Sequence, residues 1–134
     1  MSPERRLAAR LWLWGPAVAQ MAVLFLASSI PNVGELPGGT PDWVPHGAGY
    51  AILGVLLLRG FARGRRGGVT GRTVLATVVC AAIYGVTDEW HQSFVPGRSA
   101  EVHDLVADTA GAVLAAGLVW LWARRRPFGS PGVS

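Results

Sequence analysis

Residues 84–98 read YGVTDEWHQSFVPGR and form a polar cluster between two apolar parts of the chain. The cluster holds two adjacent acids, Asp88 and Glu89, followed by His91, Gln92 and Arg98. Charged groups are costly in an apolar environment unless they are paired or serve a function. A cluster in this setting therefore indicates a structural network, a functional site, or both.

The composition of the 134-residue chain indicates a membrane protein with one domain. Hydrophobic residues make up 51% of the chain and charged residues only 15%, whereas a soluble domain carries about a quarter charged residues. All twelve basic residues are arginines, and they do not gather into one basic face. We therefore expect contact with a lipid bilayer and none with nucleic acid.

Four apolar segments predict an all-α integral membrane protein, a four-transmembrane-helix bundle with helices at residues 11–30, 45–61, 73–91 and 104–122. A helix needs about 20 apolar residues to cross a hydrocarbon core of about 30 Å. The helices would form one membrane domain over residues 11–123, between a basic tail at 1–10 and a basic, then disordered tail at 124–134. A signal peptide is an alternative interpretation of the first apolar run, because an arginine-rich start and Ala27-Ser28-Ser29 fit that pattern.

The distribution of arginines predicts the orientation. Three lie before the first predicted helix, five lie around the loop after the second, and three follow the fourth, while Arg98 alone belongs to the other two loops. By the positive-inside rule, both termini are then cytoplasmic and the loops at 31–42 and 94–103 face outward. Tryptophans near both predicted interfaces support the same spans, at positions Trp12, Trp14, Trp43, Trp90, Trp120 and Trp122.

This topology would collect most polar side chains at the outer end of the bundle. The third predicted helix ends near Asp88, and its spacing to His91 and Gln92 places the three on one helical face. Asp104 and Asp108 lie one turn apart at the start of the fourth helix. We expect ligand-binding roles for His46, Tyr50, Gln92, Arg98 and Asp108, acid–base candidates in Asp88, Glu89 and Asp104, and metal-ligand candidates in His46, Asp88 and Glu89.

These residue types allow several chemistries. Carboxylates together with a histidine suit a divalent metal ion, and a single carboxylate can act as a general acid or base. An arginine can clamp a phosphate or carboxylate with two hydrogen bonds, which is the role we expect for Arg98. The two-histidine motif of zinc proteases is absent, because position 88 is Asp.

Each candidate also has a structural interpretation. Asp104 would stabilise the start of the fourth helix through the helix dipole, while Asp42, Glu101 and His103 fit solvated or interfacial positions. The buried acids could form an ion-pair network that holds the helices together, with Arg98 as the natural partner and His46 as another.

The chain resembles the VanZ-like membrane proteins from about Phe25 to Leu121. The resemblance is carried by Ser28-Ser29-Ile30-Pro31, Asp42…His46…Tyr50-Ala51-Ile52-Leu53-Gly54, Tyr84-Gly85…Asp88-Glu89…Gln92-Ser93-Phe94…Pro96-Gly97-Arg98 and Asp104…Asp108-Thr109-Ala110-Gly111. The family pattern often has lysine where this chain has Trp43 and asparagine where it has Asp108. The histidines at positions 91 and 103 have no family counterpart.

The resemblance implies a small multi-pass protein of the bacterial cytoplasmic membrane, with its site on the extracytoplasmic side. The founding member is associated with low-level resistance to teicoplanin-type glycopeptides. Our first hypothesis is a protein that binds or modulates a cell-envelope component, such as a lipid-linked precursor, through an outward polar pocket. The alternative is a hydrolase or transferase, dependent on a divalent metal, that acts on a lipid head group. A path for protons or ions is a third hypothesis.

Small residues on the predicted helices would allow close packing. They are Gly47, Ala51, Gly54, Ala81, Gly85, Gly111 and Ala115. The same residues would equally suit the interface of a homodimer.

Overall fold

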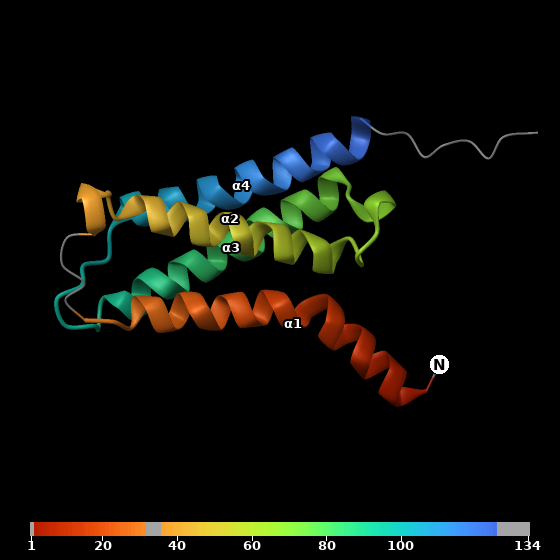
Figure 1. The fold of residues 1–134 in the computed structure, drawn as a ribbon, viewed down its shortest axis with the longest axis horizontal. Coiled ribbons are helices and arrows are strands. Elements are labelled where there is room, and N and C mark those ends of the chain that lie inside the picture. Colours follow the sequence, from red (N-terminus) through yellow and green to blue (C-terminus); the bar gives the residue numbers. More distant parts are fainter. Residues whose placement is uncertain (1, 32–35, 126–134) are drawn as a thin grey trace, which may run out of the picture.

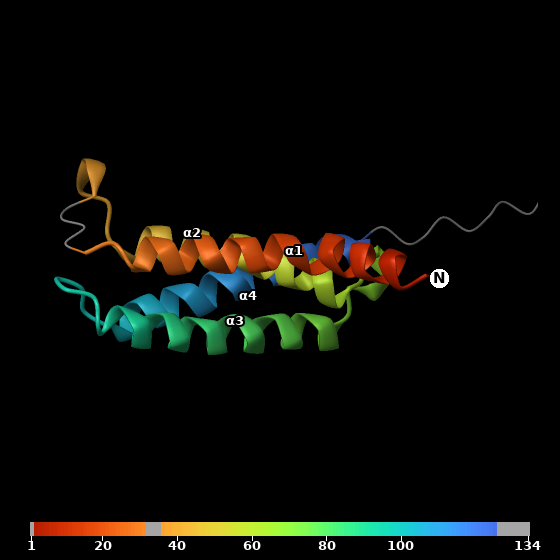
Figure 2. The ribbon, with the colours of Figure 1, turned by 90° about the horizontal axis from the view of Figure 1, so that it is seen from below.

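The computed structural model describes residues 2–31 and 36–125, which form four α-helices and two short 3₁₀ turns and contain no strand. The helices are α1 (Pro3–Ser28), α2 (Trp43–Phe61), α3 (Gly71–Gln92) and α4 (Val102–Arg125), and the turns are η1 (Pro37–Gly39) and η2 (Arg66–Gly68). Successive helices run in opposite directions along one bundle (Figures 1 and 2). The predicted all-α class is confirmed.

The two ends of the bundle differ in composition. One end, called the polar end below, holds the last turns of α1 and α3 and the first turns of α2 and α4, and therefore carries Asp88, Glu89, Asp104 and Asp108. The opposite end, called the arginine end, holds the loop between α2 and α3 with Arg63, Arg65 and Arg66.

Helices α1, α2 and α4 are long and apolar enough to cross a membrane. Their outward side chains stay uncovered, and Leu26, Leu114 and Leu118 are each 66% exposed. Large uncovered apolar faces of this kind are characteristic of a protein that lies in lipid. Helix α3 has comparable length but is less apolar, because its last turns carry acids, His91 and Gln92.

The boundaries of all four helices differ from the prediction, and those of α1 and α4 differ the most. Helix α1 begins at Pro3 and not at residue 11, because the Ser2 side chain accepts a hydrogen bond from the Arg5 amide at 3.4 Å and Glu4 lies in the first turn. Such caps and first-turn acids favour helix initiation, so residues 3–10 extend the helix. Helix α4 continues to Arg125, beyond the predicted end at 122. The predicted disorder of residues 126–134 lies outside the described residues.

An arginine compensates for a proline inside α1. Pro16 has no amide hydrogen, so it cannot donate to the Trp12 carbonyl, and Figure 1 shows that the amino-terminal part of α1 bends. The Arg59 guanidinium donates to the carbonyl oxygens of Trp12 at 2.7 Å and Leu13 at 3.1 Å. It also lies 3.9 Å from the centre of the Trp12 ring. Arg59 thus donates to the Trp12 carbonyl, which lacks a helical donor because residue 16 is proline.

Helices α2 and α4 form the most extensive contact in the bundle. A methyl group on Gly111 would lie 2.2 Å from the Gly47 carbonyl oxygen, and one on Gly54 would lie 3.0 Å from Ala112 Cα. A side chain cannot fit at Gly111, and one at Gly54 would require Ala112 to shift, so the two backbones approach directly. The predicted close packing by small residues is confirmed for this pair of helices.

We expect Gly111→Ala to destabilise the protein, because the added methyl group meets a backbone oxygen that cannot move without shifting a helix. Overpacking of this kind costs roughly 1–3 kcal/mol or more. The measurement is the midpoint of thermal unfolding in detergent. Gly117→Ala is the matched control on the same helix, since nothing lies within 4 Å of the added methyl group. Equal midpoints for the two variants would contradict the close contact.

Candidate functional site

Four carboxylates are buried at the polar end. Asp88 is 4% exposed, Glu89 and Asp104 are each 7% exposed, and Asp108 is fully buried. The helical repeat explains this, because Asp104 and Asp108 lie one turn apart and both face inward. Acids buried this deeply need partners or a bound cation.

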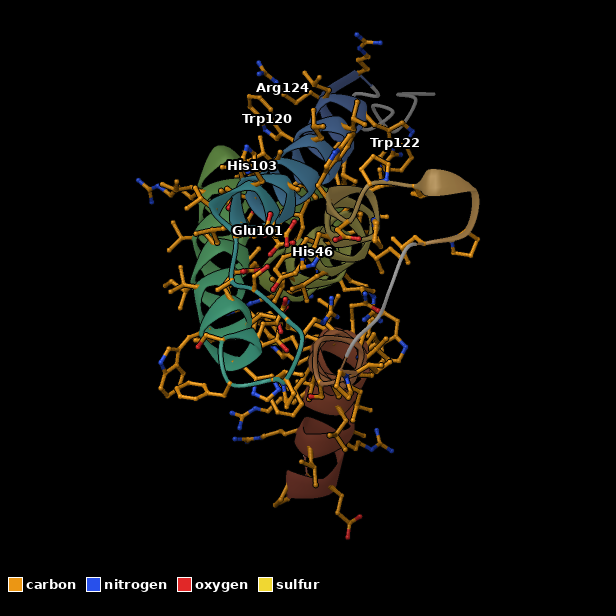
Figure 3. The ribbon with its side chains drawn as sticks, turned by 90° about the vertical axis from the view of Figure 1, so that its left-hand side faces the viewer. His46, Glu101, His103, Trp120, Trp122 and Arg124 are labelled. Carbon is orange, nitrogen blue, oxygen red and sulfur yellow. The ribbon has the colours of Figure 1, made fainter. Side chains whose placement is uncertain are left out.

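His46 joins two of these carboxylates across the contact between α2 and α4. Its Nδ1 lies 3.1 Å from Asp108 Oδ1, and its Nε2 lies 3.7 Å from Asp104 Oδ2. In Figure 3, which looks onto the polar end, His46 lies between the helices. Both predicted site acids of α4 therefore share one histidine of α2.

The prediction that Arg98 pairs with the acids is wrong for the described residues. Its Nη2 donates to the Ala27 carbonyl oxygen at 3.1 Å, and none of the ion pairs within residues 2–31 and 36–125 joins it to a carboxylate. The chain turns at Pro96-Gly97, with Gly97 at a φ of 75° and the Arg98 amide donating to the Val95 carbonyl at 3.1 Å. This turn brings the guanidinium to the end of α1.

Asp88 makes its contacts toward α1. Its carboxylate accepts hydrogen bonds from the Ser28 hydroxyl, which is buried, and from Gln92 Nε2 at 3.5 Å. Ser28 and Gln92 thus hold Asp88 between α1 and α3. His91, predicted on the same face, also contacts α1 but through other groups, with Nε2 lying 2.9 Å from Ser29 Oγ and its ring stacked on Phe25.

A cavity of about 230 Å³ lies at the polar end against α1, α2 and α3. Hydrogen-bonding side chains form one part of its lining: Ser28, Asp42, His46, Tyr50, Asp88, Gln92 and Arg98. Apolar side chains form the other part: Leu24, Ala27, Ile30, Leu36 and Pro45. Four of the predicted ligand-binding residues, His46, Tyr50, Gln92 and Arg98, therefore line one cavity, whereas Asp108 lies behind His46.

The candidate metal ligands separate into two groups. His46 and Glu89 can each place a ligand atom within 4.8 Å of one on Asp108. Asp88 is not part of that group, and its carboxylate contacts Ser28 and Gln92 instead. Glu89 Oε2 accepts from the Glu101 amide at 2.9 Å, which ties the loop before α4 to α3.

Three residues that sequence reasoning assigned to loops or the interface are exposed: Asp42, Glu101 and His103. Asp42 precedes α2 without capping it through its side chain. Asp104 lies in the first turn of α4, as expected, but it is buried against His46 and does more than favour the helix dipole.

The model of the VanZ/LLP1 family matches residues 40–123, which is more than half of the chain. The chain belongs to the VanZ/LLP1 family. No curated protein and no solved structure matches it. The VanZ/LLP1 match includes α2, α3 and α4 except for the last two residues of α4, and it therefore includes all four buried carboxylates. Helix α1 lies outside the match.

Ser28 is a site residue of this VanZ/LLP1 protein that the candidate assignment missed. It lies in the last turn of α1, outside the family match, yet its hydroxyl reaches Asp88 and it lines the cavity. The signal in the sequence was the pair of serines at the end of an otherwise apolar run.

We expect Ser28→Ala to lower stability in detergent by about 1–3 kcal/mol, because it removes a donor from a buried carboxylate. Ser93→Ala is the control, since Ser93 is exposed and donates only to the Trp90 carbonyl near the end of its own helix. The measurement is again the thermal unfolding midpoint. A Ser28→Ala midpoint equal to that of Ser93→Ala would show that Asp88 does not depend on α1.

Proposed function

We propose that this VanZ/LLP1 protein binds the polar head of a cell-envelope amphiphile, of the lipid-linked precursor class, in the cavity at its polar end. The supporting observation is the divided lining, in which hydrogen-bonding groups and apolar side chains meet in one cavity. An amphiphile presents the same division, with a polar head next to an apolar chain.

Unpartnered donors in the lining favour an acceptor-rich head group such as a phosphate. Arg98 Nε and the Tyr50 hydroxyl are buried without a hydrogen-bond partner. A buried donor without a partner is costly, so a ligand that accepts from it would gain binding energy. Charge-assisted bonds from a guanidinium to a phosphate are stronger than neutral ones. We assign Arg98 and Tyr50 to the head group, with Gln92 beside them.

We propose that the protein spans the bacterial cytoplasmic membrane four times. Helix α2 ends at the arginine end and α4 begins at the polar end, so α3 has to run the full length of the bundle between them. At the arginine end, the guanidinium groups of Arg66 and Arg124 lie 3.7 and 4.8 Å from the ring centres of Trp122 and Trp120. Arginines and tryptophans gathered at one end suit the cytoplasmic interface.

On this orientation both termini are cytoplasmic and the cavity faces the extracytoplasmic side. Any effect on glycopeptide resistance would then result from binding of a cell-wall precursor in the cavity. The small residues between α2 and α4 serve packing within the chain, so a homodimer would need other faces.

We expect the purified protein to retain a polyprenyl phosphate in native mass spectrometry and to retain the matching polyprenol less well. Arg98→Gln should weaken binding of the phosphate at least about tenfold, because one charge-assisted hydrogen bond contributes about 1.5–3 kcal/mol. Arg72→Gln is the control, since Arg72 is exposed in the first turn of α3 at the opposite end.

Equal retention of phosphate and alcohol, or equal losses in the two arginine variants, would contradict a head-group site at Arg98. Conversion of the phosphate to the free alcohol during the incubation would support the hydrolase hypothesis in place of simple binding.

The orientation makes a separate prediction for cysteine labelling. In a Cys80→Ala background, Ser99→Cys should react with a membrane-impermeant maleimide in intact cells, because Ser99 is exposed in the loop at the polar end. Ser2→Cys, which is also exposed, should react only after the cells are permeabilised. The reverse pattern would place the cavity on the cytoplasmic side.

A further inference from the structure

The charges at the polar end do not balance within the described chain. Four carboxylates are buried there, from Asp88, Glu89, Asp104 and Asp108. Within residues 2–31 and 36–125, the ion pairs of these acids are both with His46. One imidazolium carries at most one positive charge, so the remaining buried acids need either bound protons or a bound cation.

Two carboxylate oxygens of this cluster are buried without partners. Asp108 Oδ2 and Glu89 Oε1 accept no hydrogen bond from the described protein atoms. Asp108 Oδ2 faces α3, because a methyl group on Gly85 would lie 3.4 Å from it. Glu89 follows Gly85 by one turn of the same helix. The two unsatisfied oxygens therefore belong to neighbouring positions on the α3–α4 contact.

A histidine completes a set with the spacing of metal ligands. Atoms of His46, Glu89 and Asp108 that can ligate a cation lie within 4.8 Å of one another. Two ligands on opposite sides of a first-row ion lie about 4 Å apart, given bond lengths of about 2.0–2.2 Å. The three residues come from three different helices, so a small movement of side chains would close the set around an ion.

We infer that His46, Glu89 and Asp108 bind a divalent first-row transition ion, of the Mn²⁺ or Zn²⁺ class. The mixture of one imidazole nitrogen with carboxylate oxygens suits these ions better than Ca²⁺, which takes oxygen ligands. Water or a ligand group from the adjoining cavity would complete the coordination. The ion would supply the missing positive charge and connect α2, α3 and α4.

Asp104 acts on the ion through His46. His46 directs Nδ1 toward Asp108, while Asp104 lies 3.7 Å from the other ring nitrogen, Nε2. Histidine ligands commonly donate their second N–H to a carboxylate, which fixes the tautomer and the ring orientation. Asp104 is thus a positioning residue, and the ligand nitrogen is Nδ1.

The test adds Mn²⁺ to chelator-treated protein in detergent, with no lipid present. Binding is measured as the decrease of the electron paramagnetic resonance signal of free Mn²⁺. We expect one ion per chain and a higher thermal unfolding midpoint when Mn²⁺ is present. Asp108→Asn and Glu89→Gln should each weaken binding at least about tenfold and abolish the shift in midpoint. Asp104→Asn should weaken binding roughly 10–100-fold without changing the number of sites.

Exposed residues of the same types provide the controls. Glu101→Gln and His103→Gln should bind Mn²⁺ as the wild type does, because both side chains are exposed outside the cluster. The proposal is overturned if the wild type binds no Mn²⁺, or if Asp108→Asn and Glu89→Gln bind it as tightly as the two controls. If Asp108→Asn does not fold, Glu89→Gln with its Glu101→Gln control decides the question.

The metal site goes beyond the proposed binding of an amphiphile and is tested separately. Mn²⁺ is the only ligand in the experiment, so failure of polyprenyl phosphate to bind would leave the metal site in place. Failure of Mn²⁺ to bind would leave the head-group contacts of Arg98 and Tyr50 in place.

Discussion

The contact of His46 with Asp104 and Asp108 is the interaction on which the polar end depends. It places one ring between two acids that would otherwise repel each other inside the bundle, and it joins α2 to α4. A buried acid that loses its only partner costs several kcal/mol, whereas the intact pair costs much less. Glu89 Oε1 and Asp108 Oδ2 remain without hydrogen-bond partners beside this contact.

The glycines of the α2–α4 contact make that interaction geometrically feasible. Gly47 directly follows His46, and Gly111 lies three residues after Asp108 on the same helix. Because Gly111 has no side chain, its backbone approaches the Gly47 carbonyl closely. Histidine and aspartate have short side chains, so their 3.1 Å contact requires helices at this small separation. The close packing of α2 and α4 at their glycines and the ion pair between His46 and Asp108 therefore depend on the same separation of the two helices.

Much of this arrangement could be predicted from the sequence, because helical periodicity and the distribution of arginines do not depend on tertiary detail. They predicted four helices and the collection of His46, Asp88, Glu89 and Asp108 at one end. They could not predict which acid faces which neighbour, since one position along a helix changes the direction of a side chain by about 100°. Asp88 therefore turns to Ser28 while Glu89 turns toward Asp108. Arg98 was assigned the wrong partner because its direction depends on the turn at Gly97, and a carbonyl at the end of α1 was available to it.

Helix α1 has a different role from the other three helices. The family match and all four buried carboxylates lie in α2, α3 and α4, whose mutual contacts fix the acidic cluster. Helix α1 adds Leu24, Ala27 and Ser28 to the lining of the cavity and bends at Pro16 where Arg59 contacts it. Its contacts with α2 and α3 are less extensive than the α2–α4 contact. Helices α2, α3 and α4 thus hold the charges, and α1 supplies a wall of the cavity that His46 also lines.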